Sequence, residues 1–158
     1  MKDERGKLFF EMCRILREKQ PKCFIAENVK GLLTANKRSA FPLIMEEFEK
    51  SGYDVTYSIL NAAEYGVPQK RERVIIVGFR KDLNIQFAFP NTVLEKEDLY
   101  EPLSSVLEKT VDEKYFFSER AIAGMMKKRE FMNKGRAQDV EKPCNTCLLY
   151  TSPSPRDM

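Results

Sequence analysis

The first half of the chain contains two stretches in which apolar side chains recur at helical spacing. Residues 3–19 carry such a stripe and are followed by Pro21, which predicts an amphipathic helix that ends before the proline. The segment AFPLIMEEFEKSG predicts a second helix, with Pro42 near its start and Gly52 at its end. The side chains predicted to face inward are Leu8, Phe9, Met12, Ile15 and Leu16 in the first helix, and Phe41, Ile44, Met45 and Phe48 in the second.

Three further segments have the patterns of strands. CFIA is short and continuously apolar, which predicts a strand buried on both faces of a parallel sheet. DVTYSIL alternates, with Val55, Tyr57 and Ile59 on one side, and predicts a half-buried strand. VIIVGF, reached through a turn that contains Gly66 and Pro68, predicts another buried strand. The order helix, strand, helix, strand, strand favours a doubly wound α/β fold, or part of one.

From about Phe89 the chain becomes polar and is interrupted by prolines, which predicts a change of domain. We therefore expect one domain over residues 1–88 and the start of a smaller one over residues 89–146. A helix is predicted to begin at Ser118 as its N-cap. The second part also has a short helical pattern at Leu103, Val106 and Leu107. The helix that begins at Ser118 is predicted to turn Ile122, Met125 and Met126 inward. Its outward side chains would be Lys127, Lys128 and Arg129, which form either a solvated face or a binding patch.

The residue composition limits the kinds of catalysis and metal binding that the chain can support. With 42% hydrophobic and 32% charged residues, the 158-residue chain is globular in composition, and its net charge of +3 permits a nucleic-acid partner without requiring one. Histidine is absent, which excludes histidine-based acid/base catalysis and mixed Cys/His zinc sites. Cys13 and Cys23 are predicted to pack as small buried hydrophobes, and Cys144-x-x-Cys147 lacks the second pair that a zinc site needs, so no metal is predicted.

Neither a membrane-length apolar run nor a signal-peptide core is present, which favours a cytoplasmic localisation.

Two polar segments lie next to predicted strands and are the candidates for chemistry. Glu27 and Asn28 end the first strand, at the edge where open α/β sheets bind ligands, and a carboxylate there would be partly desolvated. The alternative is a glutamate that makes a salt bridge at a strand end. Both interpretations remain open from this segment alone.

The second segment, QKRER, precedes the strand VIIVGF. In an extended chain Gln69, Arg71 and Arg73 share one face, while Lys70 and Glu72 share the other. The guanidinium groups offer rigid forks of donors suited to carboxylates, phosphates and base edges. The alternative is a hydrophilic turn whose charges guard an aggregation-prone strand.

Together, ENVKGLL and NAAEYGVPQKRERVIIVGFR resemble two ordered motifs of the cytosine-C5 DNA methyltransferases. The resemblance covers about residues 1–90, and residues 89–146 resemble more loosely the start of the target-recognition region of these enzymes. It implies an α/β fold in which part of a Rossmann-like S-adenosylmethionine-dependent methyltransferase sheet is followed by a small recognition subdomain.

The resemblance also implies roles for individual residues. A cysteine thiolate attacks C6 of a flipped cytosine, and C5 then takes a methyl group from S-adenosyl-L-methionine. Glu27 would protonate N3, and Arg73 would hold the carbonyl oxygen. Arg71 would organise the pocket, and Asn28 and Gln69 would order the neighbouring backbone; Val29 completes the Glu-Asn-Val motif. The implied partner is double-stranded DNA, in a prokaryotic-type enzyme that fits a restriction-modification system.

Some expected parts of this family are not found in the sequence. No Pro-Cys dipeptide precedes Glu27, and no glycine-rich cofactor loop is present. Pro143-Cys144 follows both motifs, so Cys144 is not a candidate nucleophile. Residues 147–158 resemble the translated read-through of a sequencing adapter, or a disordered Ser/Pro-rich tail. We therefore expect an internal fragment that is inactive by itself. Two alternatives stay open: an RNA cytosine-C5 methyltransferase, and a non-catalytic α/β module that binds nucleic acid.

Overall fold

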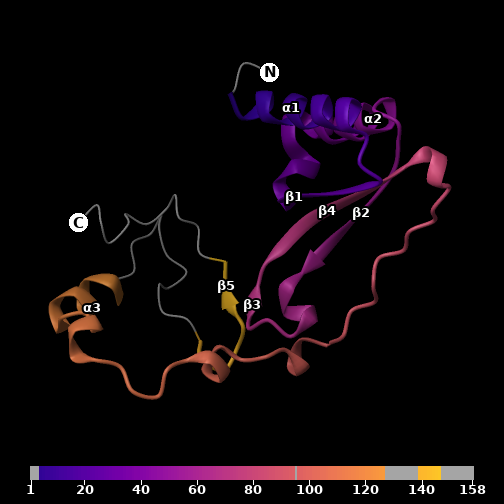
Figure 1. The fold of residues 1–158 in the computed structure, drawn as a ribbon. Coiled ribbons are helices and arrows are strands. Elements are labelled where there is room, and N and C mark those ends of the chain that lie inside the picture. The colour runs from indigo at the N-terminus through magenta and orange to yellow at the C-terminus, as the bar shows by residue number, and fades with distance from the viewer. Residues whose placement is uncertain (1–3, 95, 127–138, 147–158) are drawn as a thin grey trace. The chain divides into compact units, whose positions relative to one another are not determined.

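The computed structural model describes residues 4–94, 96–126 and 139–146 (Figure 1). They have a mixed α/β architecture, as predicted, and divide into two compact units. The first unit comprises Met1–Leu60 and Glu72–Asn91, and the second comprises Asn61–Arg71 and Thr92–Met158. None of the helices in the described residues has the length and hydropathy needed to span a membrane.

The first unit contains the two helices and three strands predicted for residues 3–79, together with two 3-10 helices that were not predicted. In chain order they are α1 (Glu4–Lys19), β1 (Cys23–Val29), the 3-10 helix η1 (Lys30–Arg38), α2 (Ala40–Lys50), β2 (Tyr53–Asn61), β4 (Glu72–Arg80) and the short 3-10 helix η3 (Lys81–Leu83). The last residue of β2 already belongs to the second unit.

The sheet of the first unit has the strand order β1-β4-β2, so β4 is central and β1 is an edge strand. β1 and β4 run antiparallel, in a register that pairs Cys23 with Phe79 and Val29 with Arg73. The N–H of Lys81 donates to the carbonyl of Gly52 at 3.0 Å, which joins the end of β4 to the start of β2. The described partner of β1 is therefore antiparallel, and the predicted parallel pairing is wrong for these residues.

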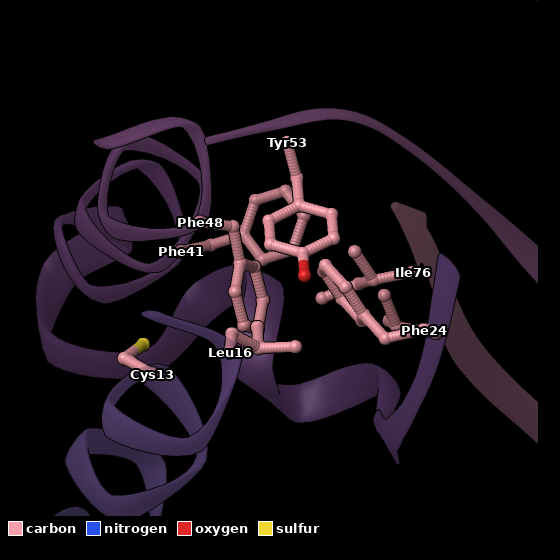
Figure 2. Close-up of a cluster of buried hydrophobic side chains, with 8 residues drawn as sticks. Cys13, Leu16, Phe24, Phe41, Phe48, Tyr53 and Ile76 are labelled. Atoms are coloured by element: carbon pink, nitrogen blue, oxygen red, sulfur yellow. The ribbon is translucent and has the colours of Figure 1, made fainter. Parts of the chain in front are cut away.

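The hydrophobic core lies between α1, α2 and one face of the sheet (Figure 2). Phe24 contacts Phe48 at 4.7 Å between ring centroids and Tyr53 at 5.2 Å. All three rings are buried, and Tyr53 is completely so, although the strand pattern had not singled it out. The buried cluster consists of Cys13, Leu16, Phe24, Phe41, Phe48, Tyr53, Val74 and Ile76.

The inward face of α1 differs partly from the prediction. Cys13 and Leu16 are buried, and Phe9 and Met12 pack against the same cluster. Leu8 is 71% exposed and Ile15 is 49% exposed, so the prediction that these two side chains face inward is wrong. The reason is geometric, because the contact stripe follows positions 9, 12, 13 and 16, and the residues beside it lie too far around the helix to touch the sheet.

In α2 the predicted stripe is confirmed: Phe41 and Phe48 are buried, and Ile44 and Met45 pack against the core.

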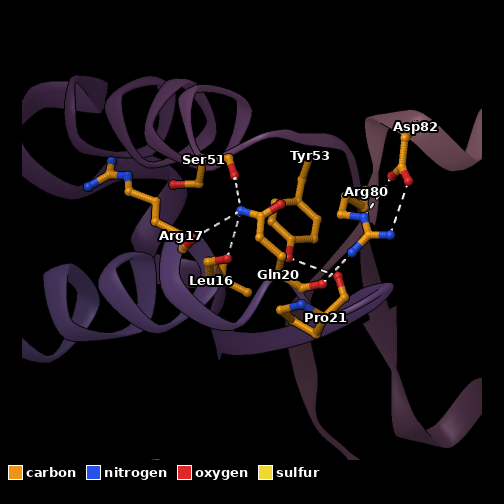
Figure 3. Close-up of polar contacts among 8 residues, drawn as sticks. All are labelled: Leu16, Arg17, Gln20, Pro21, Ser51, Tyr53, Arg80 and Asp82. Atoms are coloured by element: carbon orange, nitrogen blue, oxygen red, sulfur yellow. Dashed lines mark hydrogen bonds and ion pairs between the residues drawn. The ribbon is translucent and has the colours of Figure 1, made fainter.

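Four elements meet at the turn that follows α1 (Figure 3). Gln20 adopts the left-handed conformation with φ 45°, and its Nε2 donates to the Ser51 carbonyl at 3.3 Å. Arg80 Nη1 donates to the Gln20 carbonyl at 2.7 Å, and the Tyr53 hydroxyl donates to the Pro21 carbonyl at 2.8 Å. These bonds tie the ends of α1 and α2 to the start of β2 and the end of β4.

The second face of the sheet is covered unevenly. Phe79 of β4 contacts Phe87 at 5.8 Å between ring centroids, so the segment after β4 covers this face of the central strand. On β1, Ile25 is 71% exposed and Cys23 is exposed as well. The predicted burial of CFIA on both faces, and of Cys23, is therefore wrong in the described structure, because β1 is an edge strand that α1 and α2 cover on one face.

The second unit is built mainly from short elements. Its Ser118 N-cap is confirmed, because the N–H of Ala121 donates to Ser118 Oγ at 3.4 Å. Ile122 is 47% exposed, so its predicted inward position is wrong: an amphipathic pattern marks a face that can be buried, but burial requires a packing partner. Lys127–Arg129 lie outside the described residues. The elements are η2 (Ala62–Tyr65), β3 (Gln69–Lys70), η4 (Glu97–Leu99), η5 (Leu103–Val106), η6 (Glu113–Tyr115), α3 (Glu119–Met126) and β5 (Cys144–Asn145), with β3 and β5 paired in parallel.

Candidate functional site

The antiparallel pairing of β1 with β4 brings the two candidate motifs together. The last residues of β1 lie opposite the first residues of β4: Asn28 pairs with Val74, and Val29 with Arg73. Glu27 pairs with Ile75, which lies two residues from Arg73 in the same strand. Because side chains two positions apart in a strand share a face, Glu27 and Arg73 lie on the same side of the sheet.

Glu27 and Arg73 form an ion pair. Arg73 Nε lies 2.7 Å from Glu27 Oε1, and Arg73 Nη1 donates to the backbone carbonyl of Glu72 at 2.8 Å. The arginine side chain is only 17% exposed, so the guanidinium is held in place by the strand and by its carboxylate partner. The structure thus joins two side chains from motifs that are far apart in the sequence.

Glu27 is partly covered at the end of β1. Its side chain is 52% exposed. The expected partial desolvation of this carboxylate stays a prediction. The salt bridge itself is the alternative that the sequence left open, and the catalytic role of Glu27 stays a prediction.

A second ion pair lies beside the first and was missed by the sequence reasoning. Lys30 Nζ contacts both carboxylate oxygens of Glu72, at 2.8 Å and 3.0 Å. Lys30 follows β1 directly, and Glu72 precedes Arg73 directly. The only signal in the sequence was the predicted turning of Glu72 away from the arginine face, toward the side where a cation that follows β1 can meet it. This pair ties the same two motifs together a second time.

The remaining predicted residues of the QKRER motif belong to the second unit. Gln69 lies in β3 and pairs with Cys144, and Lys70 Nζ lies 3.0 Å from Glu97 Oε2. The backbone N–H of Arg71 donates to the side-chain carbonyl of Asn61 at 3.1 Å. The predicted common face of Gln69, Arg71 and Arg73 spans both units and stays a prediction.

Asn28 makes a local contact in the described structure. Its Oδ1 accepts a hydrogen bond from the N–H of Val29 at 2.8 Å, which stiffens the end of β1. Val29 itself is 54% exposed and contributes no buried packing. The proposed role of Asn28 in ordering a neighbouring loop stays a prediction.

The cysteines show no sign of a metal or nucleophile site within the described residues. No group of three or more His, Cys, Asp or Glu side chains there could hold a metal ion. Burial raises the pKa of the Cys13 thiol, which disfavours the reactive thiolate. Cys144 lies in β5, half-buried, and Cys147 falls outside the described residues.

The second unit has a pocket of about 300 Å³ of its own, lined by Lys70, Glu97, Asp98, Tyr100, Glu141, Lys142 and Pro143. The pKa of Tyr100 is raised, first by burial and then by the neighbouring charges of Glu64 and Glu97. None of Glu27, Arg71 and Arg73 lines this pocket.

Chemically, the Glu27–Arg73 pair offers an acceptor and a fork of donors on one face of a sheet. Such a pair is suited to a planar group that presents both a donor or basic nitrogen and an acceptor oxygen. In the structure the carboxylate and the guanidinium bind each other.

Comparison with known proteins identifies relatives. The model of the family "C-5 cytosine-specific DNA methylase" matches residues 1–145. The chain is 57% identical over 99 residues to the Type II methyltransferase M.FnuDI of Fusobacterium nucleatum, an alignment that covers 62% of this chain and 29% of the relative. It is 37% identical over 134 residues to M.DsaV of Dactylococcopsis salina, covering 84% of this chain and 37% of the relative. The chain thus spans about a third of the length of these relatives.

Solved structures share the fold. A Spodoptera frugiperda DNMT2 mutant superimposes with a TM-score of 0.58 at 22% identity, covering 75% of this chain and 37% of that one. The S. pombe Dnmt2 methyltransferase gives a TM-score of 0.57 at 20% identity, covering 78% of this chain and 39% of that one. At these identities the likeness supports the α/β fold.

Proposed function

The chain belongs to the C-5 cytosine-specific DNA methylase family, and on this premise we propose that it forms the base-holding part of a DNA cytosine-C5 methyltransferase. The observation that carries the proposal is the 2.7 Å pair between Glu27 and Arg73, which brings together the Glu-Asn-Val and Gln-x-Arg-x-Arg motifs. The substrate is a cytosine flipped out of duplex DNA.

The roles of the two side chains follow from the chemistry of the base. When a thiolate adds to C6, the S–C6 bond forms, the C5=C6 double bond shifts to C4=C5, and N3 takes up a proton. Glu27 donates that proton to N3, and Arg73 donates hydrogen bonds to the carbonyl oxygen at C2. The bound base therefore takes the place of Arg73 as the partner of Glu27, and the place of Glu27 as the partner of Arg73. For Arg71, which belongs to the same motif as Arg73, we propose a role in organising the base pocket.

The thiolate and the cofactor site are proposed to come from other parts of a complete enzyme. The described residues contain no glycine-rich loop that could cradle a nucleotide-like cofactor, and the sole Pro-Cys dipeptide of the sequence follows both motifs. S-adenosyl-L-methionine, when bound in the complete enzyme, supplies the methyl group. We propose accordingly that residues 1–88 belong to the catalytic domain and residues 89–146 to the start of the target-recognition region. Residues 147–158, expected to be non-native, lie outside the described residues.

The central test is Glu27→Gln in the complete enzyme that contains this chain. The amide keeps the size of the side chain but cannot donate the proton, so methyl transfer to duplex DNA should fall by about 10²–10⁴-fold. Glu46→Gln is the matched control, because Glu46 also makes one 2.7 Å ion pair and is 53% exposed, against 52% for Glu27. A Glu27→Gln enzyme within tenfold of the unmodified enzyme would overturn the proposal.

Two further outcomes are distinguished by the same assay. The purified 158-residue chain should transfer no methyl group to DNA above background, and transfer by the chain alone would contradict the proposed need for an external thiolate. If the complete enzyme methylates RNA and leaves duplex DNA unmodified, the substrate assignment fails while the base-holding role of Glu27 stands.

A further inference from the structure

Arg71 is held at its backbone by a side chain outside its own motif. The residue lies between β3 and β4 and is part of neither strand. Its N–H donates to Asn61 Oδ1 at 3.1 Å, and its carbonyl accepts a hydrogen bond from the N–H of Ala62 at 3.1 Å. Both backbone groups of Arg71 are therefore bound by two consecutive residues, the last of β2 and the first of η2.

One side-chain atom of Asn61, the oxygen Oδ1, accepts two hydrogen bonds. The same Oδ1 accepts a hydrogen bond from the N–H of Ala63 at 3.3 Å, which caps the first turn of η2. A side-chain carbonyl has two lone pairs and can serve both donors. Ala63 is fully buried, so the turn that Asn61 caps is anchored in the packing of the second unit.

The residues before Arg71 are hydrogen-bonded by a different part of the chain. The N–H of Cys144 donates to the carbonyl of Pro68 at 2.9 Å, and Thr146 Oγ1 donates to the carbonyl of Lys70 at 2.8 Å. In an extended chain the backbone groups of consecutive residues point to opposite sides. The carbonyls of residues 68 and 70 therefore meet Cys144 of β5 and Thr146 just after it, while both backbone groups of Arg71 meet Asn61 and Ala62.

We propose that Asn61 is a positioning residue for Arg71: its side-chain carbonyl fixes the stretch of backbone that carries the guanidinium. The inference rests on the proposed function, in which Arg71 organises the base pocket. Asn61 touches neither the base nor the cofactor and acts through the position of Arg71 alone. A displacement of about 1 Å in such a group can cost 10²-fold in rate.

The chain permits a sharp pair of substitutions. Asn61→Asp keeps an oxygen in place for both N–H donors, whereas Asn61→Ala removes the acceptor and leaves the two donors without it. The aspartate variant therefore retains the positioning contacts at nearly the same size, and differences between the two variants report on the acceptor.

The experiment measures kcat and KM for duplex DNA in the complete enzyme carrying Asn61→Ala, Asn61→Asp, Arg71→Ala or both alanine substitutions. Asn61→Ala should lower kcat/KM by about 10–100-fold, and Asn61→Asp should lie within about threefold of the unmodified enzyme. In the Arg71→Ala background, Asn61→Ala should cause no further loss, because a positioning residue has nothing left to position.

The inference is overturned if Asn61→Ala is fully active, if Asn61→Asp is as impaired as Asn61→Ala, or if the losses of the two alanine substitutions add in full. Full addition would show a purely structural role. Hydrogen exchange at the Arg71 amide provides a readout that does not depend on catalysis, and it should be faster in Asn61→Ala and unchanged in Asn61→Asp. If Arg71→Ala is fully active while this exchange behaves as expected, the contact holds and the role proposed for Arg71 fails.

Discussion

Gly78 is the position where a single methyl group should most disturb the first unit. It lies in β4 directly opposite Phe24 of β1. A Cβ atom at this position would lie 2.5 Å from Phe24 Cζ and 2.8 Å from Cδ1, and would approach Cε1 still more closely. Ordinary contacts between carbon atoms are about 3.5–4.0 Å, so in Gly78→Ala the ring has to move by about 1 Å.

The ring cannot move freely, which sets the size of the effect. Phe24 packs against Phe48 and Tyr53, which are 1% and 0% exposed. Overpacking a core typically costs about 1–3 kcal/mol, and loosening an aromatic pair adds about 0.5–1.5 kcal/mol. Replacing glycine by alanine returns about 0.4–1 kcal/mol through the unfolded chain. We therefore expect Gly78→Ala to lower the free energy of unfolding by about 2–3 kcal/mol.

Urea denaturation of the 158-residue chain, followed by far-UV circular dichroism, measures this loss directly. In thermal unfolding it corresponds to a fall in Tm of about 5–10 °C for a chain of this size. Gly124→Ala is the matched control: this glycine lies in α3 with no atom within 4 Å of the added methyl, so the substitution should be neutral or slightly stabilising.

A second background isolates the cause. Phe24→Leu removes Cε1 and Cζ, the two ring atoms nearest to the added methyl, so Gly78→Ala should cost less than about 1 kcal/mol there. An unchanged urea midpoint for Gly78→Ala, or the same loss in both backgrounds, would refute the argument that Gly78 makes room for the ring.

Three further predictions concern charge, thiol reactivity and strand pairing. The hydrogen bond from Arg80 holds the pKa of Asp82 below its ordinary 3.8, so ionised Asp82 stabilises the fold above about pH 4 and this contribution is lost as the pH falls through the lowered pKa. Asp82→Asn should therefore lower the urea midpoint at about pH 6 and leave it unchanged at about pH 2. Iodoacetamide should alkylate the exposed Cys23 in the folded chain but the buried Cys13 only in denaturant, as peptide mass spectrometry will show; equal labelling of both would contradict the described core. Thr146→Val should speed amide exchange in β5 whereas Thr146→Ser should not, and equal exchange in both variants would exclude the hydroxyl contact.

Local pattern was enough to predict the elements of the first unit. The helical stripes gave α1 and α2, and the apolar and alternating runs gave β1, β2 and β4. Each depends on the spacing of neighbouring residues, which the sequence states directly. The Ser118 cap was predictable for the same reason, because an N-cap bond joins residues three positions apart.

Burial was predicted less well, because it depends on what packs against an element. Ile25 and Ile122 have apolar neighbours in sequence but are largely exposed. Tyr53 stands at the first position of β2 and is fully buried, because its ring packs against Phe24 in the core cluster. Such contacts join residues from different elements, and no local period records them.

The same distinction between local pattern and tertiary packing applies to the candidate site. The sequence by itself determined which side chains could do the chemistry, since carboxylate and guanidinium groups are properties of Glu27, Arg71 and Arg73. Only the tertiary structure decided that Glu27 meets Arg73, because that contact depends on the antiparallel register of β1 and β4 across more than forty residues of chain. The hold of Asn61 on Arg71 is likewise a product of the fold, since the turn after β2 returns the chain to the same point. Register is fixed by the packing of whole strands and helices, and that packing is a property of the folded chain.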